Sequence, residues 1–177
     1  MNRLLTAQQI KNALSRLYGA IAEAIPSDGR VAVIGIRTRG ETLAARIIER
    51  LREEDPSRQY DHGVLDITFY RDDLAMRRGA PLVRATEIDF DLDGAYVVLI
   101  DDVLHTGRSV RAALDALHDF GRPTVVRLGV LIDRGGRELP IAADFVGRKV
   151  EAPDNKRVQV KLKENDGEEG VFIIRRH

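Results

Sequence analysis

Two adjacent carboxylates and a short loop of hydroxyl, glycine and basic residues stand at the centre of the chain. Asp101 and Asp102 follow an apolar run at 97–100, and the loop at 105–109 precedes a helical pattern. A strand that passes through such a loop into a helix is typical of a phosphate site, because loop N–H groups and the helix dipole attract an anion. Gly107 lets the backbone approach the ligand closely.

The two carboxylates would repel a phosphate. We therefore expect them to bind neutral hydroxyls, such as a ribose diol, or a metal ion. The same pattern also fits an ordinary loop at the carboxyl edge of an α/β sheet. Neither the Gly-x-x-x-x-Gly-Lys-Ser/Thr loop nor the Gly-x-Gly-x-x-Gly motif occurs in the chain.

A second strand, loop and helix occur near the N-terminus. The apolar residues 31–36 lead into Arg37-Thr38-Arg39-Gly40, and residues 43–51 continue with helical spacing. Arginine suits a doubly charged phosphate group, because its fork can bind two oxygens. A solvated surface loop is the alternative interpretation.

A third strand is expected over 65–70, followed directly by Arg71-Asp72-Asp73. The basic segment of about 74–86 is long for a loop in a compact domain, and such loops are usually functional. Arg71 could instead form a surface pair with Asp73.

These loops need a common scaffold. Apolar strands at 31–36, 97–100 and 124–132 alternate with amphipathic helices, and Thr6 with Gln9 predicts a capping box for the first helix. Val110, Leu114 and Leu117 are expected on the buried side of the helix after the acidic pair. This order predicts an α/β fold with a mainly parallel twisted sheet, whose strand-end loops meet at one crevice. Residues 158–162 and 171–174 predict a hairpin appended over that crevice.

Composition limits the class of protein. The 177 residues fit one domain, and 28 basic residues balance 28 acidic ones, so no overall field favours nucleic acid or membranes. The absence of cysteine excludes disulfides and thiolate metal sites. No long apolar run predicts a signal peptide or membrane span, so a cytoplasmic protein is expected.

The stretch 97–109 resembles the phosphoribosyl-diphosphate (PRPP) signature of type I phosphoribosyltransferases. The resemblance implies that Asp101 and Asp102 hold the ribose hydroxyls, and that the diphosphate is bound by Thr38, Arg39 and Arg71. It further implies Mg²⁺ held mainly through substrate, with Asp101 and Asp102 as candidate ligands, and a flexible loop that closes over the substrates. The catalytic candidates are thus Asp101, Asp102, Arg71 and Arg39. The candidates for the 5′-phosphate are His105, Thr106, Gly107, Arg108 and Ser109.

Several stretches together resemble the PyrR family of pyrimidine operon attenuator proteins: GIRTRG at 35–40, LDITFYRDDL at 65–74, DDVLHTGR at 101–108, DRGGRELPI at 133–141 and ADFVG at 143–147. The resemblance implies uracil phosphoribosyltransferase activity, which forms UMP and diphosphate from uracil and PRPP. It also implies UMP-dependent binding of leader RNA, a homodimer or higher homo-oligomer, and one domain with a core of about 1–132 and a β hood of about 133–177. Uracil would lie near Asp133, Arg134, Gly135 and Val158.

The sequence departs from this family where RNA is concerned. Gly136 stands where a histidine is usual, Ala142 replaces an arginine, and Gly19 replaces a histidine. The remaining candidate contacts with RNA phosphates are Arg137, Arg148, Lys149, Arg16 and Lys11.

Three other functions stay open from the sequence. The chain could transfer phosphoribose to orotate or a purine, it could be an RNA-binding regulator without catalysis, or it could bind a sugar phosphate without chemistry.

Overall fold

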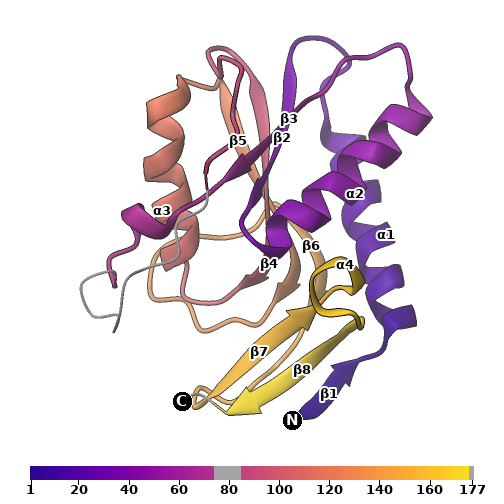
Figure 1. The fold of residues 1–177 in the computed structure, drawn as a ribbon, viewed down its shortest axis with the longest axis vertical. Helices are drawn as coiled ribbons and strands as arrows, with labels where there is room; N and C mark the ends of the chain where they lie inside the picture. Colours follow the sequence, from indigo (N-terminus) through magenta and orange to yellow (C-terminus); the bar gives the residue numbers. More distant parts are fainter. Residues whose placement is uncertain (74–84, 176–177) are drawn as a thin grey trace.

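The computed structural model describes residues 1–73 and 85–175, so the expected closing loop at 74–86 lies almost entirely outside the described residues. Figure 1 shows a parallel sheet with helices on both faces and a smaller sheet at one end. The larger sheet has the strand order β3-β2-β4-β5-β6, and all of its pairs are parallel. Its strands are β2 (Val31–Ile36), β3 (Asp61–Leu65), β4 (Tyr96–Leu104), β5 (Val125–Asp133) and β6 (Phe145–Lys149).

The helices divide the core into two layers. Helices α1 (Ala7–Ala24) and α2 (Arg39–Glu54) cover one face, and α3 (Arg108–Leu117) covers the other (Figure 1). Strand residues alternate between these layers, so Val31 and Val33 pack with α1 and α2, whereas Ala32 and Ile34 pack with α3. No helix among residues 1–73 and 85–175 is long and apolar enough to cross a membrane.

The ends of two helices test the predictions made from spacing. The capping box of α1 is confirmed, because Thr6 Oγ1 accepts from Gln9 N–H at 3.3 Å and Gln9 Oε1 accepts from Thr6 N–H at 2.9 Å. The predicted buried face of α3 is partly wrong. Leu114 is 37% exposed, and alanines at 112, 113 and 116 pack the helix closely against the sheet instead.

The strand expected over 65–70 is wrong in its bounds. Strand β3 ends at Leu65, and Thr68–Tyr70 form a single 3₁₀ turn. Asp66 causes this change, because its Oδ1 accepts hydrogen bonds from the N–H and the hydroxyl of Thr68, at 2.8 and 2.5 Å. Phe69 is consequently 66% exposed.

The smaller sheet forms the hood. Its order is β1-β8-β7 and both of its pairs are antiparallel. Its elements are β1 (Asn2–Leu5), β7 (Lys156–Lys161), the short helix α4 (Lys163–Asp166) and β8 (Gly170–Arg175). The expected boundary near residue 133 therefore needs two changes, because β1 belongs to the hood sheet and β6 belongs to the parallel sheet.

Candidate active site

A cavity of about 790 Å³ opens where the ends of β2, β3 and β4 meet the hood strands β7 and β8. This is the carboxyl edge of a parallel sheet, where α/β proteins bind ligands. The expected residues on its wall are Thr38, Arg39, Arg71, Asp101, Asp102, His105, Thr106, Ser109, Arg134 and Val158. Gly107, Arg108, Asp133 and Gly135 are not on the wall.

The acidic pair lies within the last residues of β4. This strand continues to Leu104 rather than ending before Asp101. Asp101 is 8% exposed, and its Oδ1 accepts from Asp102 N–H at 2.9 Å. Burial raises the pKa of Asp101 well above its ordinary value, and the negative charge of Asp102 raises it further. Ionisation of both carboxyl groups is thus costly unless a cation or a developing positive charge lies beside the pair.

The loop after β4 has the form of an anion cradle. Gly107 precedes α3 with φ at +92°, a conformation that favours glycine, and a Cβ there would lie 3.2 Å from the side chain of Ile141. The carbonyl oxygen of Thr106 is held by the N–H groups of Glu138 and Leu139 at 3.0 and 3.1 Å. The N–H of Arg108, the first residue of α3, donates to Thr106 Oγ1 at 3.3 Å, and the other N–H groups of this first turn have no acceptor within the helix and point toward an anion site.

The turn after β2 places both Arg37 and Arg39 on the cavity wall, and Arg37 also braces the turn. The peptide bond between Arg37 and Thr38 is cis, and α2 begins at Arg39 rather than after a longer loop. The guanidinium of Arg37 bonds to Glu41, Glu87 and the carbonyl oxygen of Ala85 at 2.9, 3.1 and 3.0 Å. Arg37 therefore ties this turn to the segment that returns along β3.

The sequence left two roles open for Arg71, a place in the binding site and a pair with Asp73, and the structure shows Arg71 both on the cavity wall and paired with Asp73. Its Nε and Nη2 donate to Asp73 at 2.9 and 3.0 Å, and its Nη1 donates to Ser109 Oγ at 3.1 Å. The hydrogen bonds with Asp73 raise the pKa of Arg71, so the guanidinium stays charged. The pair with Asp73 forms, and it also holds Arg71 beside the phosphate loop.

Arg134 is a buried brace behind the expected base site. Its Nη1 donates to the carbonyl oxygen of Lys156 at 2.8 Å, and its Nη2 lies 3.3 and 3.2 Å from those of Ala152 and Pro153. Arg134 and Val158 line the cavity, whereas Asp133 turns toward Arg137, with which it pairs at 2.8 Å. Of the residues expected to contact uracil, Arg134 and Val158 thus line the cavity, and Asp133 does not.

Several residues on the wall were not identified from the sequence. Asp66 and Thr68 follow β3, so the rule that ligands bind at strand ends could have found them. Lys156, Arg157 and Gln159 come from β7. No local pattern marks them, because their position depends on how the hood lies against the parallel sheet.

The candidate RNA contacts separate into surface and internal residues. Arg16, Arg148 and Lys149 are exposed, and Arg16 Nη1 donates to the carbonyl oxygen of Gly147 at 3.1 Å, which places α1 beside β6. Lys11 is exposed further toward the start of α1. Arg137 is different.

Arg137 bonds within the protein, to Asp133 and to the carbonyl oxygens of His105 and Ile141, at 2.8 to 2.9 Å. We therefore assign Arg137 a structural role rather than an RNA contact.

The three departures from the family pattern all lie on the surface. Gly19 has open space around it, and Ala142 is exposed. Gly136 has φ at +73°, and a Cβ there would lie 2.8 Å from Nε2 of His105. The imidazole of His105 thus lies where a side chain at position 136 would begin.

No cluster of three or more histidine, cysteine or acidic side chains capable of holding a metal occurs in the described part of the chain. The donor set of Asp101 and Asp102 nevertheless fits Mg²⁺, which is commonly bound through one or two carboxylates together with substrate oxygens and water.

Comparison with known proteins places this geometry in a family. The family model for the phosphoribosyl transferase domain matches residues 1–165. The bifunctional protein PyrR of Roseiflexus sp. is 53% identical over 174 residues, which cover 98% of this chain and 94% of that protein. The bifunctional protein PyrR of Thermus aquaticus is 51% identical over 170 residues, covering 96% and 93% of the two chains.

Solved structures agree on the fold. The hypoxanthine phosphoribosyltransferase of Trypanosoma cruzi superposes with a TM-score of 0.71 at 17% identity, over 100% of this chain and 98% of that one. The hypoxanthine-guanine phosphoribosyltransferase of Bacillus anthracis gives a TM-score of 0.67 at 16% identity, over 88% and 85% of the chains. The family model and the relatives that match almost the whole chain show that the chain belongs to the phosphoribosyltransferase family, and within it to the PyrR proteins.

Proposed function

We propose that this protein transfers the phosphoribosyl group of PRPP to uracil and forms UMP and diphosphate. The observation that carries the proposal is that Arg39, which follows β2, lines the same cavity as Asp102 and Thr106, which lie at the end of β4 and in the loop after it. The family membership and the close relationship to bifunctional PyrR proteins support the same reaction. We also propose that the core and the hood act as a single domain.

Each part of PRPP has a matching part of the cavity. The loop 105–109 and the start of α3 would bind the 5′-phosphate, and Asp101 and Asp102 would hold the two ribose hydroxyls. Arg39 and Arg71 would bind the diphosphate, together with Thr38. The base would lie beside Val158, in the part of the cavity supported by Arg134.

The reaction follows from this arrangement. The bond between C1′ and the diphosphate oxygen breaks, and the diphosphate leaves with the electron pair. N1 of uracil forms the new bond to C1′ and releases its proton to solvent. Arg39 and Arg71 stabilise the charge that develops on the diphosphate, while the acidic pair stabilises the positive charge on the ribose. No side-chain nucleophile is needed.

Mg²⁺ would suit this reaction, because it would neutralise the charge of the diphosphate. Asp101 and Asp102 would hold it together with substrate oxygens. Their contribution is to orient the diol and to keep the charge of the site fixed during bond breaking.

A panel of bases tests the reaction. Purified protein is incubated with PRPP, Mg²⁺ and one of uracil, orotate, hypoxanthine or guanine, and the nucleotide product is identified by chromatography. We expect UMP from uracil and at least a hundredfold less product from the other bases. Predominant transfer to orotate or a purine would contradict the assigned substrate.

We propose a second function, UMP-dependent binding of pyrimidine leader RNA, because Arg16, Arg148 and Lys149 expose a basic surface where α1 meets β6. A gel shift with leader RNA should show tighter binding with UMP and weaker binding at high salt. Binding that ignores UMP would contradict a regulatory role. Action on nascent transcripts would place the protein in the cytoplasm, and a homo-oligomer stays a prediction of the resemblance.

A further inference from the structure

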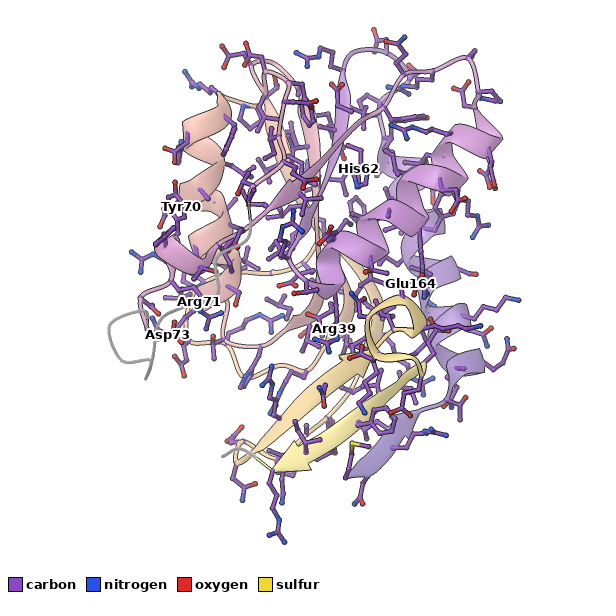
Figure 2. The ribbon with its side chains drawn as sticks, in the orientation of Figure 1. Arg39, His62, Tyr70, Arg71, Asp73 and Glu164 are labelled. Atoms are coloured by element: carbon purple, nitrogen blue, oxygen red, sulfur yellow. The ribbon has the colours of Figure 1, made fainter. Side chains whose placement is uncertain are left out.

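Three consecutive residues of α4 join the hood to one face of α2. The α2 partners lie at positions 39, 42 and 46, which share a helix face, and each bonds to a different α4 residue. We call these three pairs the hood clasp: Arg39 with Asp166, Thr42 with Asn165, and Arg46 with Glu164. Figure 2 shows Arg39 and Glu164 at this junction between α2 and the hood.

Two pairs of the clasp share a bidentate geometry. Arg39 donates from Nε and Nη2 to Asp166 at 3.1 and 2.6 Å. Arg46 donates from the same two nitrogens to Glu164 at 2.8 and 2.6 Å, and its Nη2 also lies 2.6 Å from Glu169.

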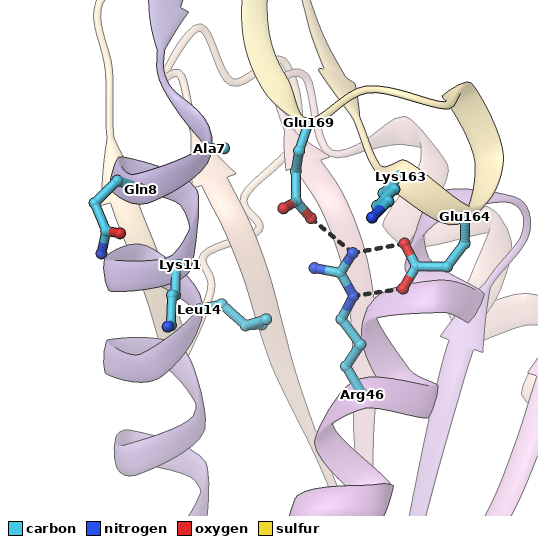
Figure 3. Close-up of a pocket in the computed structure, with 8 residues that line it drawn as sticks. All are labelled: Ala7, Gln8, Lys11, Leu14, Arg46, Lys163, Glu164 and Glu169. Carbon is cyan, nitrogen blue, oxygen red and sulfur yellow. Dashed lines mark hydrogen bonds and ion pairs between the residues drawn. The ribbon is translucent and has the colours of Figure 1, made fainter.

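Only one of these two pairs reaches the candidate active site. Arg39 lines the 790 Å³ cavity. Arg46 and Glu164 instead line a separate cavity of about 640 Å³ between α1, α2 and α4 (Figure 3). The chain therefore contains two similar arginine–carboxylate pairs, of which one ends at the site and the other does not.

Asp166 is itself held in place. Its Oδ2 accepts the N–H of Leu162 at 2.9 Å, and its side chain is 15% exposed. Burial would raise the pKa of Asp166, but the hydrogen bonds from Arg39 and Leu162 outweigh this and lower it. A charged, fixed carboxylate thus binds one side of the Arg39 guanidinium.

The opposite side of that guanidinium remains available. Among the described residues, the hydrogen bonds of Arg39 use Nε and Nη2, so Nη1 keeps its donors for a ligand. Arginine has a long side chain that loses rotamer freedom when it binds, and an internal ion pair lowers this cost in advance.

We propose that Asp166 is a positioning residue, which holds the Arg39 guanidinium in the orientation that binds the diphosphate of PRPP. This inference rests on the proposed function and adds to it a residue from the hood. The opposite relationship would be competition, in which Asp166 and the diphosphate exclude each other from Arg39. The direction of the change in PRPP affinity distinguishes the two.

The test uses Asp166→Asn, with Glu164→Gln as the matched control. The asparagine carbonyl can still accept from Leu162 N–H, but the negative charge that faces Arg39 is lost. We expect Asp166→Asn to raise the KM for PRPP about tenfold and to change the KM for uracil less than twofold. Glu164→Gln should leave both KM values within twofold of wild type. A lower KM for PRPP in Asp166→Asn, or equal changes in both variants, would overturn the proposal.

A double-mutant cycle asks whether Asp166 acts through Arg39. In an Arg39→Lys background, Asp166→Asn should change the KM for PRPP less than twofold, because lysine has no guanidinium to orient. A full tenfold effect in that background would overturn the inference.

Calorimetric binding of PRPP with Mg²⁺ separates this inference from the proposed function, because it needs no base. Wild type that binds PRPP but makes no UMP would contradict the proposed reaction alone, and the variants would still test Asp166. Equal PRPP affinity of wild type and Asp166→Asn would contradict the positioning role alone.

Discussion

Gly40 and Ile100 bring the two central motifs into direct contact. A Cβ atom on Gly40 would lie 2.5 Å from the carbonyl oxygen of Ile100 and 3.2 Å from Cα of Asp101. The first turn of α2, which begins at Arg39, therefore packs directly on the backbone of the acidic pair. The diphosphate side and the ribose side of the cavity are held together by backbone contact rather than by flexible side chains.

This contact predicts a strong effect of Gly40→Ala. The added methyl group must move α2 away from β4, so we expect a loss of about 2–3 kcal/mol of stability and a clear drop in UMP formation. Gly19→Ala is the control, because Gly19 lies in a helix with open space around it and alanine there should stabilise by about 0.5–1 kcal/mol. Urea unfolding of both variants measures this, and equal stability would contradict the close approach.

Asp102→Asn should mainly damage turnover. The substitution keeps the size and one acceptor of the side chain but removes a charge beside the ribose, so we expect kcat to fall by roughly a hundredfold. The KM for uracil should change little. Steady-state kinetics with PRPP and uracil measure both values, and unchanged PRPP-dependent activity would refute the role assigned to Asp102.

The raised pKa of Asp101 predicts that the stability of the protein depends on pH when no ligand is bound. Because its pKa is raised in the folded state, the protonated form is favoured there, and this contribution is complete below the unfolded pKa of about 4. It is lost as the pH rises through the folded pKa. Asp101→Asn cannot ionise, so it should match wild type near pH 4 and exceed it by on the order of 1 kcal/mol at pH 8. Denaturation across this range checks the trend, and an advantage that shrinks at high pH would contradict it.

Replacing Arg134 should weaken the binding of uracil more than the binding of PRPP. Arg134→Gln leaves carbonyl oxygens of the segment 152–156 without their donors, which should destabilise the protein by about 1–3 kcal/mol. The displaced segment borders β7, so the KM for uracil should rise more than the KM for PRPP. A selective rise in the KM for PRPP would show that the base lies elsewhere.

Much of this site could be predicted from the sequence because its residues follow apolar strands directly. The chain positions of Asp102, Thr106 and Arg39 relative to buried strands place them at one sheet edge, whatever the details of packing. The capping box at Thr6 was equally local, and its hydrogen bonds are present.

The parts that were missed depend on contacts between distant segments. Asp66 ends β3 early, because its side chain accepts a hydrogen bond from Thr68 N–H. The prediction followed the apolar pattern of 65–70, which favours a longer strand. Leu114 fits a helical stripe, yet close packing of alanines leaves it at the surface. The pairing of β1 with β8, and of Asp166 with Arg39, joins residues more than a hundred positions apart, for which no local pattern exists.

The most direct test is the reaction itself, followed as UMP and diphosphate from uracil, PRPP and Mg²⁺ with purified protein. We expect the two products to form in equal amounts, and only when PRPP and uracil are both present. We expect Asp102→Asn to lose most of the rate while still binding PRPP. Failure of the wild-type protein to form UMP under these conditions, with PRPP bound, would contradict it.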